Sequence, residues 1–337
     1  MRSAPDSPTI KQVAERAGVS TATVSRVLSG GGGGVRRELI AKVRQAVSSL
    51  DYQPNRVARN LRVRTTKTVG LIISDIQNPF FTSVVRGVED VIHRAGFTLL
   101  LANTDDDQNR EEIYLTTLRE ESVAGLIFVT GNGQSEGFRR LQAARIPLVA
   151  IDRVPAGLSV DQVVVANAEG AREATEQFLR KGHRRIGFIG GPPHLNTASE
   201  RQSGYEQALK TAGVRLTREL IVHGNFRQEG GYQAMRQLLA LSQPPTAVFV
   251  SNNLMALGAL RAIHERNLLI PTEMGVISFD DMPWATSIQP PLTAVAQPTY
   301  ELGSSAAELL LARMREPDRP IRRIVLQTQL MIRASCG

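Results

Sequence analysis

The stretch TIKQVAERAGVSTATVSRVLSG, residues 9–30, predicts two short helices joined by a tight turn. Thr9 and Gln12 have the spacing of a capping box, which begins a helix. Gly18 can adopt the left-handed conformation that ends one. Apolar residues recur at helical spacing and give the first helix one apolar face, made of Ile10, Val13, Ala14 and Ala17.

The second helix of this stretch has two distinct faces, and Ser20 can cap its start. Its inner face consists of Val24, Val27 and Leu28. Its outer face consists of Thr21, Ala22, Ser25 and Arg26. A helix-turn-helix presents such an outer face to the major groove of DNA. A small helical hairpin with no role in DNA binding has the same spacing, so spacing alone leaves both interpretations open.

The run IKQVAERAGVSTATVSRVLSG resembles the N-terminal headpiece of the LacI/GalR (lactose-repressor) family of bacterial transcription regulators. Its order of Val-Ala, Ala-Gly-Val-Ser and Thr-Val-Ser-Arg-Val-Leu is more specific than helix-turn-helix spacing alone. The resemblance implies that Thr21, Ala22 and Arg26 recognise bases, with Arg26 placed to donate two hydrogen bonds to a guanine. The expected contacts to the DNA backbone come from Thr9, Ser20, Ser25, Arg59 and Arg62.

The charge of the chain is concentrated at one end. Residues 1–68 contain 13 Lys or Arg and 4 Asp or Glu residues, a net +9, whereas the other 269 residues contain 27 and 28, a net −1. A basic module attached to a nearly neutral body favours a polyanionic partner. The charge distribution therefore supports DNA as the partner of the headpiece.

The composition excludes several other classes of protein. Cys336 is the single cysteine of the 337 residues, so no disulfide can form within the chain, which fits a reducing cytoplasm. No Cys/His cluster has the spacing of metal ligands, and we expect neither a metal nor a cofactor. The N-terminus lacks the apolar core of a signal peptide, and no apolar run approaches about 18 residues. We therefore expect a cytoplasmic protein, on the nucleoid when bound to its operator, with no membrane partner.

The headpiece is predicted to extend over residues 9–53, after a disordered lead-in at residues 1–8. Five consecutive glycines at positions 30–34 predict a flexible loop before a third helix at about 36–50. The family usually has Ser or Thr after the valine that corresponds to Val35, but this chain has Arg36. A basic residue at a helix start opposes the macrodipole. We therefore expect an uncapped, frayed start to the third helix.

Residues 54–68 are predicted to form a hinge helix and a linker. Pro54 stops any preceding helix, and the short helix that follows is marginal alone in water. It resembles the hinge helix of the family, which forms when two copies meet in the DNA minor groove. The resemblance implies that Leu61 is a wedge between base pairs, and a packing contact with the third helix is the alternative. The expected minor-groove residues are Asn55, Val57, Ala58 and Leu61.

From residue 69 onward, short apolar runs alternate with helical patterns, which predicts two doubly wound parallel sheets. The first series has strands at 69–74, 98–103, 125–130, 148–152 and 163–166, with helices at 80–95, 108–121 and 135–145. The second has strands at 185–191, 220–224, 247–252 and 275–281, with helices at 199–213, 229–241 and 254–266. We expect a two-lobed α/β core that resembles periplasmic binding proteins. Lobe one covers about 69–165 and 296–322, and lobe two covers about 166–295 and 323–335, with a last strand at about 323–333 closing lobe two.

Polar residues follow several of these strands, and strand C-termini point at the ligand in such sheets. The resemblance implies that Arg201 and Asp280 contact an effector, because an arginine and a carboxylate together can hold neighbouring hydroxyls of a sugar. Flat apolar faces for a sugar ring could come from phenylalanines, and from Trp284. A helix cap or an ordinary core position is the alternative for each residue, and Asn253 is expected to cap a helix beginning at residue 254. The expected effector site comprises Phe80, Asp105, Asp152, Arg201, Phe226, Asn252, Asp280 and Gln297.

Taken together, these features predict a transcriptional repressor that binds a near-palindromic operator and responds to a carbohydrate effector held between the two lobes. No heptad tail follows the last strand, so we expect a homodimer rather than a coiled-coil tetramer. A sugar-binding protein of the solute-receptor type is the alternative, which the basic headpiece disfavours. The sequence contains no dinucleotide fingerprint, so we do not expect an enzyme.

Overall fold

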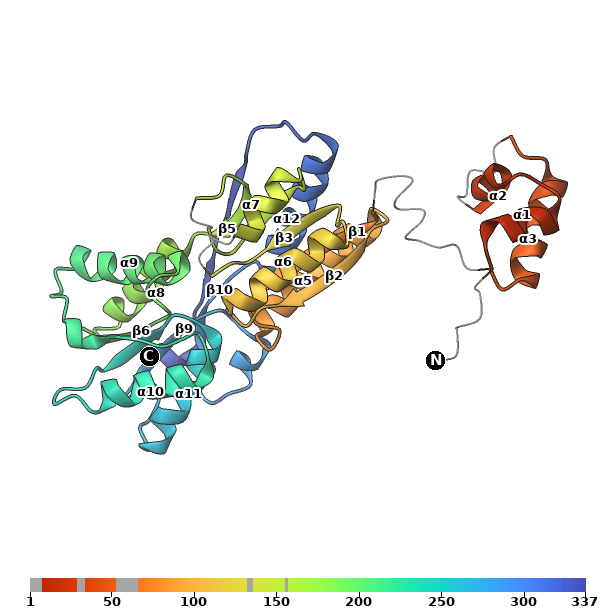
Figure 1. The fold of residues 1–337 in the computed structure, drawn as a ribbon. Coiled ribbons are helices and arrows are strands. Elements are labelled where there is room, and N and C mark those ends of the chain that lie inside the picture. Colours follow the sequence, from red (N-terminus) through yellow and green to blue (C-terminus); the bar gives the residue numbers. More distant parts are fainter. Residues whose placement is uncertain (1–7, 29–33, 53–65, 132–135, 155–156) are drawn as a thin grey trace. The chain divides into compact units, whose positions relative to one another are not determined.

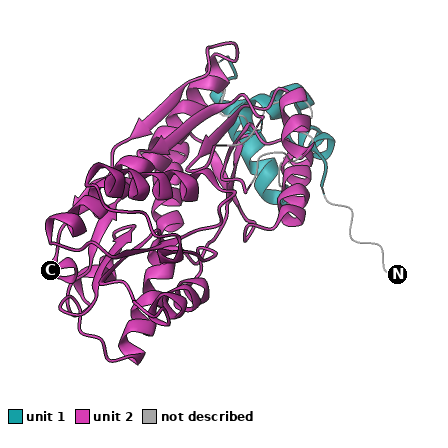
Figure 2. Ribbon diagram, turned by 90° about the vertical axis from the view of Figure 1, so that its left-hand side faces the viewer, with its two compact units in different colours: residues 1–66 teal, residues 67–337 magenta. Residues whose placement is uncertain are grey.

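A computed structural model describes residues 8–28, 34–52, 66–131, 136–154 and 157–337. It divides the chain into two compact units, residues 1–66 and residues 67–337, which Figure 2 shows in different colours. We call the first unit the headpiece and the second the core. The hinge residues Asn55, Val57, Ala58, Arg59, Leu61 and Arg62 lie outside the described residues.

The headpiece contains three helices, α1 (Ile10–Ala17), α2 (Thr21–Leu28) and α3 (Arg37–Ser49). The predicted capping box is confirmed, because the backbone N–H of Thr9 donates to Oε1 of Gln12 at 2.7 Å and the backbone N–H of Gln12 donates to the hydroxyl of Thr9 at 3.4 Å. Gly18 ends α1 in the left-handed conformation, with a φ of +63°. Ser20 caps α2 by accepting from the backbone N–H of Thr23 at 3.2 Å. Both start signals in the sequence therefore have the predicted geometry.

The three helices enclose a small apolar core, which includes the fully buried Val13, Val24 and Val43. Helix α3 begins after Arg36, whose side chain makes no capping hydrogen bond. The predicted absence of a side-chain cap is thus confirmed. The N–H groups at this end must find other partners, such as water, because the first four have none within the helix.

The first lobe of the core is a six-stranded sheet with the order β11-β5-β4-β3-β1-β2. All of its strand pairs are parallel. The strands are β1 (Thr68–Ile73), β2 (Thr98–Asn103), β3 (Gly125–Phe128), β4 (Leu148–Ile151), β5 (Asp161–Val165) and β11 (Arg323–Leu326). The helices of this lobe are α5 (Pro79–Arg94), α6 (Gln108–Glu120), α7 (Glu136–Ala143) and α12 (Thr299–Arg315). Figure 1 shows α12 lying among elements from the first half of the core.

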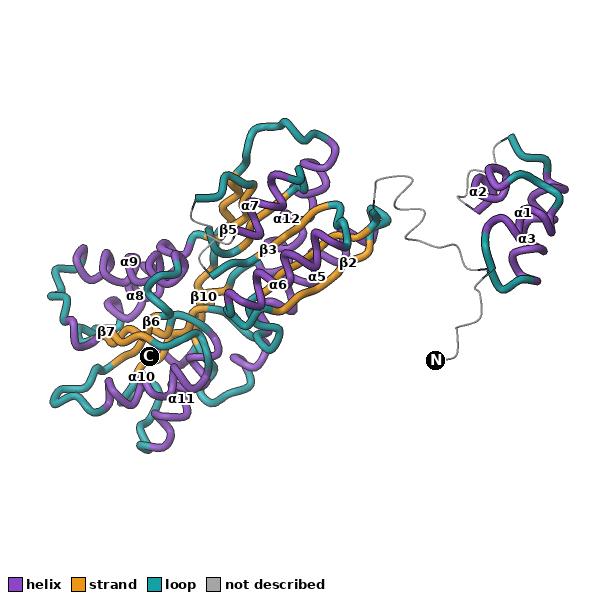
Figure 3. The backbone as a smooth tube through the Cα atoms, viewed as in Figure 1, coloured by secondary structure: helices purple, strands orange, loops and turns teal. Residues whose placement is uncertain are grey.

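The second lobe repeats this architecture, with a sheet of order β12-β10-β9-β8-β6-β7. Its strands are β6 (Ile186–Gly190), β7 (Ile221–His223), β8 (Ala247–Val250), β9 (Gly275–Phe279), β10 (Thr293–Ala296) and β12 (Gln329–Met331). Its helices are α8 (Asn167–Arg180), α9 (Asn196–Thr211), α10 (Gln228–Leu239) and α11 (Asn253–Glu265), with the short helices η1 (Arg218–Leu220), η2 (Pro283–Thr286) and η3 (Ala334–Cys336). Figure 3 shows helices on both faces of each sheet. Of the described helices, none has the length and apolar character needed to cross a membrane.

Two features of the core differ from the prediction. The strand expected at 323–333 is in fact two strands, because β11 pairs with β5 in lobe one and β12 pairs antiparallel with β10 in lobe two. The assignment of 323–326 to lobe two was therefore wrong. Helix α8 was not predicted, since its sequence NAEGAREATEQFLR is mostly polar. It buries its few apolar residues, including Ala171, Ala174 and Phe178, against the second sheet.

Candidate effector site and DNA-binding face

The outer face of α2 lies as the sequence predicts. Thr21, Ala22 and Arg26 are exposed, whereas Val24 and Val27 are buried in the headpiece core. The three exposed side chains share one side of the helix. A partner can therefore reach them, and their contact with DNA bases stays a prediction.

The residues expected to contact the DNA backbone differ in their exposure and in the hydrogen bonds that they make within the headpiece. Thr9 and Ser20 are exposed, and their hydroxyls already accept hydrogen bonds from the starts of α1 and α2. Ser25 is half-buried on α2. Any phosphate contact from Thr9 or Ser20 must therefore combine with its capping role.

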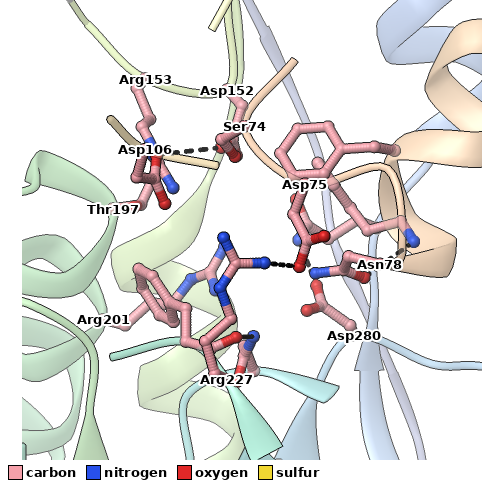
Figure 4. Close-up of a pocket in the computed structure, with 15 residues that line it drawn as sticks. Ser74, Asp75, Asn78, Asp106, Asp152, Arg153, Thr197, Arg201, Arg227 and Asp280 are labelled. Atoms are coloured by element: carbon pink, nitrogen blue, oxygen red, sulfur yellow. Dashed lines mark hydrogen bonds and ion pairs between the residues drawn. The ribbon is translucent and has the colours of Figure 1, made fainter. Parts of the chain in front are cut away.

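The core contains a small cavity between its two lobes, with a volume of about 40 Å³. Figure 4 shows the polar side chains that converge on the cavity from both lobes. The lining consists of Ser74, Asp75, Asn78, Phe80, Phe81, Asp106, Asp152, Arg153, Thr197, Arg201, Phe226, Arg227, Asn252, Asp280 and Gln297.

Carboxylates reach the cavity because the parallel strands end at it. Asp75 comes two residues after β1, and Asp152 and Asp280 directly follow β4 and β9. Asp152 and Asp280 have φ angles of +63° and +71°, in the left-handed region that aspartate tolerates better than most residues. The chain therefore turns sharply at each strand end, and it leaves a buried carboxylate beside the cavity.

Arg201 is held rigidly by lobe two. Its Nε donates to Oδ1 of Asn167 at 2.8 Å, and its Nη1 donates to the carbonyl of Ser251 at 2.7 Å. Its guanidinium lies 3.8 Å from the centroid of the Phe279 ring, and the side chain is buried. A guanidinium fixed by both hydrogen bonds and stacking loses little entropy when it binds a ligand.

Burial dominates the electrostatics of this cluster. It raises the pKa of Asp152 to about 6, against the opposing attraction of Arg153 and Arg201. It also raises the pKa of Asp280, although Arg201 and a hydrogen bond from Gln297 oppose the shift. Burial lowers the pKa of Arg201 for the same reason. The site therefore pairs buried charges of both signs that a ligand can engage.

Two buried polar atoms of the lining make no hydrogen bond within the described part of the chain, Nε of Arg153 and Oε1 of Gln297. Leaving such a buried group without a partner costs about 1–3 kcal/mol. One atom is a donor and the other an acceptor, and a hydroxyl group can serve either. Both atoms can therefore hydrogen-bond to a polar ligand, although Nε of Arg153 also forms an ion pair with Asp152 at 3.8 Å.

The two lobes are joined across the cavity by polar contacts. Asp75 of lobe one forms an ion pair with Arg227 of lobe two, drawn in Figure 4. Nδ2 of Asn253 donates to Oδ1 of Asn78 at 2.8 Å, and both side chains are buried. The cavity is thus enclosed by contacts that separation of the lobes would break.

Seven of the eight residues expected at the effector site line this cavity, and Asp105 does not. Asp105 instead forms an exposed ion pair with Arg110 at 2.5 Å. Its neighbour Asp106 lines the cavity and pairs with Arg153 at 2.5 Å. The placement of Asp105 was therefore wrong by one residue, because Asp105 and Asp106 both have positive φ angles in a sharp turn. Contact of the other seven with an effector stays a prediction.

Two further interpretations can be compared with the structure. Helix α11 begins at Asn253, and its N-cap is Asn252, which accepts from the backbone N–H of Met255 at 2.9 Å. The predicted start at residue 254 was wrong by one residue. Trp284 packs against the apolar cores of both lobes and is not among the residues that line the cavity.

Sequence reasoning missed some of the lining because loop residues gave no signal of direction. Arg153 and Asp106 are an example, since their ion pair joins loops 47 residues apart. Asn78 could have been found, because an asparagine before a proline and two phenylalanines is a helix cap, and it accepts from the backbone N–H of Phe80 at 3.0 Å. The remaining lining residues outside the predicted set are Ser74, Asp75, Phe81, Thr197 and Arg227.

The raised pKa of Asp152 makes the stability of the ligand-free protein depend on pH. The folded pKa of about 6 exceeds the reference value of 3.8. Between these values the folded state holds a proton that the unfolded state releases, so stability falls as pH rises through this window. We expect the free energy of unfolding of Asp152→Asn, measured relative to that of the parent protein, to increase by about 1.5 kcal/mol from about pH 5 to about pH 8. Urea unfolding at both pH values measures this gain, and an equal difference at the two values would contradict it.

Comparisons with known proteins agree with this architecture. The family model described as "Bacterial regulatory proteins, lacI family" matches residues 9–55, and a "Periplasmic binding protein-like domain" matches residues 175–336. The ribose operon repressor of Haemophilus influenzae is 37% identical over 97% of this chain and 98% of its own length. The PurR repressor of Pectobacterium carotovorum is 39% identical over 91% of this chain and 90% of its own length.

Solved structures of related proteins have the same fold. The lac repressor dimer bound to operator and the anti-inducer ONPF aligns with a TM-score of 0.84 and 26% identity, covering 98% of this chain and 99% of that one. The complex of the regulator CelR with cellobiose has a TM-score of 0.75 and 33% identity, covering 97% and 99%. Because relatives of this similarity align over nearly its whole length, the chain belongs to the lacI family of bacterial regulatory proteins and is a transcriptional repressor with a small-molecule effector.

Proposed function

We propose that this protein binds a near-palindromic operator as a homodimer in the cytoplasm, and that its effector is a neutral monosaccharide of the ribose type. The buried cluster of Arg201, Asp152 and Asp280 at the interlobe cavity carries this proposal. A guanidinium donates hydrogen bonds and a carboxylate accepts them, so such a cluster can hold the neighbouring hydroxyls of a sugar. The effector would shift operator affinity through its different affinities for two arrangements of the lobes.

The charge of the lining favours a neutral ligand. Four aspartates and three arginines line the cavity, and Asp75, Asp106 and Asp152 lie next to arginines that offset them. A phosphorylated sugar would add negative charge beside carboxylates that are already buried. Phe80 and Phe226 line the same cavity and supply flat apolar surfaces for a sugar ring.

Several of the relatives support a pentose. Ribose operon repressors are 37% identical to this chain, and a lacI-family regulator from Enterococcus faecium with bound ribose aligns with a TM-score of 0.73 at 28% identity. The latter comparison covers 80% of this chain and 98% of that one. Because the cavity has a volume of only about 40 Å³ in this arrangement of the lobes, a monosaccharide would require the lobes to move apart.

An apolar groove in lobe two and an exposed edge strand in lobe one support a homodimer. In lobe two, Leu257, Leu260 and Ile288 line an open groove with charged residues at its rim. In lobe one, the edge strand β2 exposes Leu100 and Leu101. An exposed edge strand with apolar side chains invites pairing with another chain. A second copy of the core, covering both surfaces, would also place two headpieces for two operator half-sites.

The proposal is tested by a gel-shift assay with genomic DNA fragments, with and without D-ribose. We expect salt-sensitive, sequence-selective binding that changes on addition of ribose and not of ribose 5-phosphate. Calorimetry with a panel of D-ribose, D-glucose and cellobiose then measures which sugar binds. Absence of selective DNA binding in every effector state would contradict the repressor function. Selective DNA binding without any response to ribose would contradict only the proposed identity of the effector.

Substitution of Arg26 tests the proposed contact of the exposed face of α2 with DNA bases. We expect Arg26→Ala to lose about 1–3 kcal/mol of discrimination at one operator position, because it removes a bidentate contact to guanine. Competition gel shifts between the selected operator and single-base variants measure this loss. Lys11→Ala, on the exposed side of α1, is the control and should leave base preference unchanged. An unchanged preference in Arg26→Ala would show that another residue recognises the base.

A further inference from the structure

One end of lobe one carries a concentration of basic residues that the effector site does not use. All strands of the first sheet are parallel, so their first residues lie at the same edge, opposite the cavity. Backbone hydrogen bonds at this edge join Lys67 to Thr98 at 2.7 Å and Arg322 to Gln162 at 2.9 Å. We call the cations at this edge the basic face. It consists of Lys67, Arg94, Arg119, Arg145, Arg315, Arg319, Arg322 and Arg323.

The cations of the basic face are available to a partner. Seven are exposed and Arg319 is half-buried, and none forms an ion pair with a carboxylate in the described part of the chain. The carboxylates at the same edge are fewer, and they are Glu120, Glu121, Glu316 and Asp318. The face therefore has a net charge of about +4, on a core whose total net charge is 0.

The corresponding edge of lobe two provides a contrast. Two of its arginines form ion pairs, Arg180 with Glu176 at 3.8 Å and Arg185 with Glu219 at 2.6 Å, whereas Lys210, Arg215 and Arg218 form none with a described residue. Arg184 donates to a backbone carbonyl at 2.9 Å. The strand-start edge of lobe two therefore has both paired and unpaired cations, whereas none of the eight cations of the basic face forms an ion pair among the described residues.

The densest part of the basic face is held by a buried ion pair. Arg313 binds both carboxylate oxygens of Asp161, at 2.9 and 3.0 Å, and also donates to the backbone carbonyls of residues 317, 319 and 320. Asp161 in turn accepts from the backbone N–H of Arg322 at 2.8 Å. These contacts fix the loop 316–322, so the side chains of Arg319 and Arg322 extend from an ordered backbone.

Duplex DNA is the polyanion that the chain itself brings near this face. Lys67 is the first residue of the core, and the described headpiece ends at Tyr52. The segment between them can span at most about 50 Å when fully extended. DNA held by the headpiece is therefore kept at high local concentration around this edge of lobe one.

We propose that the basic face binds the phosphate backbone of DNA flanking the operator. The inference rests on the repressor function proposed above, and it adds a second, sequence-independent contact surface on the core. Contacts of this type strengthen binding and steepen its salt dependence without altering base preference. An acidic protein is the competing occupant, and the experiment below separates the two.

The test compares two triple variants of equal charge change in the full-length protein. Arg319→Gln, Arg322→Gln and Arg323→Gln together remove the densest part of the basic face. Lys210→Gln, Arg215→Gln and Arg218→Gln remove exposed lobe-two cations that form no ion pair with a described residue. The probes are a short duplex limited to an operator selected by the wild-type protein and a long duplex with natural flanks.

We expect the first triple variant to lose affinity for the long duplex only. The slope of log affinity against log salt should become less negative by about 0.9 for each phosphate that the variant no longer binds. Each such phosphate contact accounts for a fall of about 3.5-fold in affinity when the salt is raised from 50 to 200 mM, and the variant should no longer show that part of the fall. The lobe-two variant should match the wild type on both duplexes. Ribose binding should be unchanged in both, which verifies the fold.

Each remaining outcome is decisive. Equal slopes for the wild type and the first variant on the long duplex would overturn the proposal and leave an acidic protein as the occupant. An equal loss in both variants would also overturn it, because net charge would then explain the effect. Failure of the wild type to select any operator would instead contradict the repressor function itself.

Discussion

Replacing Arg201 with methionine is expected to abolish the response to ribose at concentrations that saturate the wild type. The affinity for ribose should fall by about 30- to 1000-fold, or about 2–4 kcal/mol, because a buried charged hydrogen-bonding partner is removed. Arg201 lies between Asp152 and Asp280, so its removal also leaves two buried carboxylates without their shared cation. Both carboxyls would then bind protons more tightly and become poorer acceptors for sugar hydroxyls.

Calorimetry with D-ribose measures the loss of affinity. A gel shift with the selected operator, with and without ribose, measures the loss of the response. The variant should still bind operator in the absence of ribose, which shows that it folds. Arg201→Lys keeps the charge but loses the planar fork that contacts Asn167 and Ser251, so we expect an intermediate loss. A wild-type ribose response in Arg201→Met would remove Arg201 from the effector site.

Positions at strand ends were predictable from the sequence because a simple rule fixes their place. An acidic or amide residue one or two positions after a buried parallel strand lies at the carboxyl edge of its sheet. Asp152, Asn252 and Asp280 satisfy this rule and line the cavity. Arg201 was identified by resemblance to the family motif, since its position inside a helix gives no such local signal.

Positions inside tight loops were not predictable in the same way. Asp105 and Asp106 are chemically identical neighbours, and only the backbone turn decides which one meets Arg153. The pairing of Asp75 with Arg227 depends on how closely the lobes approach, which no local pattern encodes. Long-range contacts of this kind are set by the packing of the whole core.

The end of the core shows another limit of prediction from the sequence. Residues 323–333 contain two apolar runs, 324–326 and 330–332, which the prediction joined into one strand across the polar residues 327–329. The structure interrupts it at residues 327–328, where the chain leaves the sheet of lobe one and enters the sheet of lobe two. Hydrophobic periodicity identifies strands but carries no information about which of two similar sheets they join.

The second large effect concerns the ion pair that holds the start of β5 and the loop before β11. We expect Arg313→Met to lower the free energy of unfolding by about 3–5 kcal/mol, the usual cost of breaking a buried pair. The side chain of Asp161 is fully buried, and it would lose the cation that its two oxygens bind. Three loop carbonyls would also lose their donor. Urea unfolding followed by circular dichroism measures the change.

The double variant Asp161→Asn with Arg313→Met separates the charge from the packing. An asparagine can still accept the hydrogen bond from the backbone of Arg322, while it leaves no uncompensated charge. It should therefore recover part of the missing stability, because the main penalty in the single variant is an unpaired buried carboxylate. Equal destabilisation of the single and double variants would mean that the loop contacts of Arg313, rather than its charge, maintain this end of lobe one. In that case the single variant should also lose the salt dependence assigned to the basic face, since Arg319 and Arg322 would no longer extend from an ordered loop.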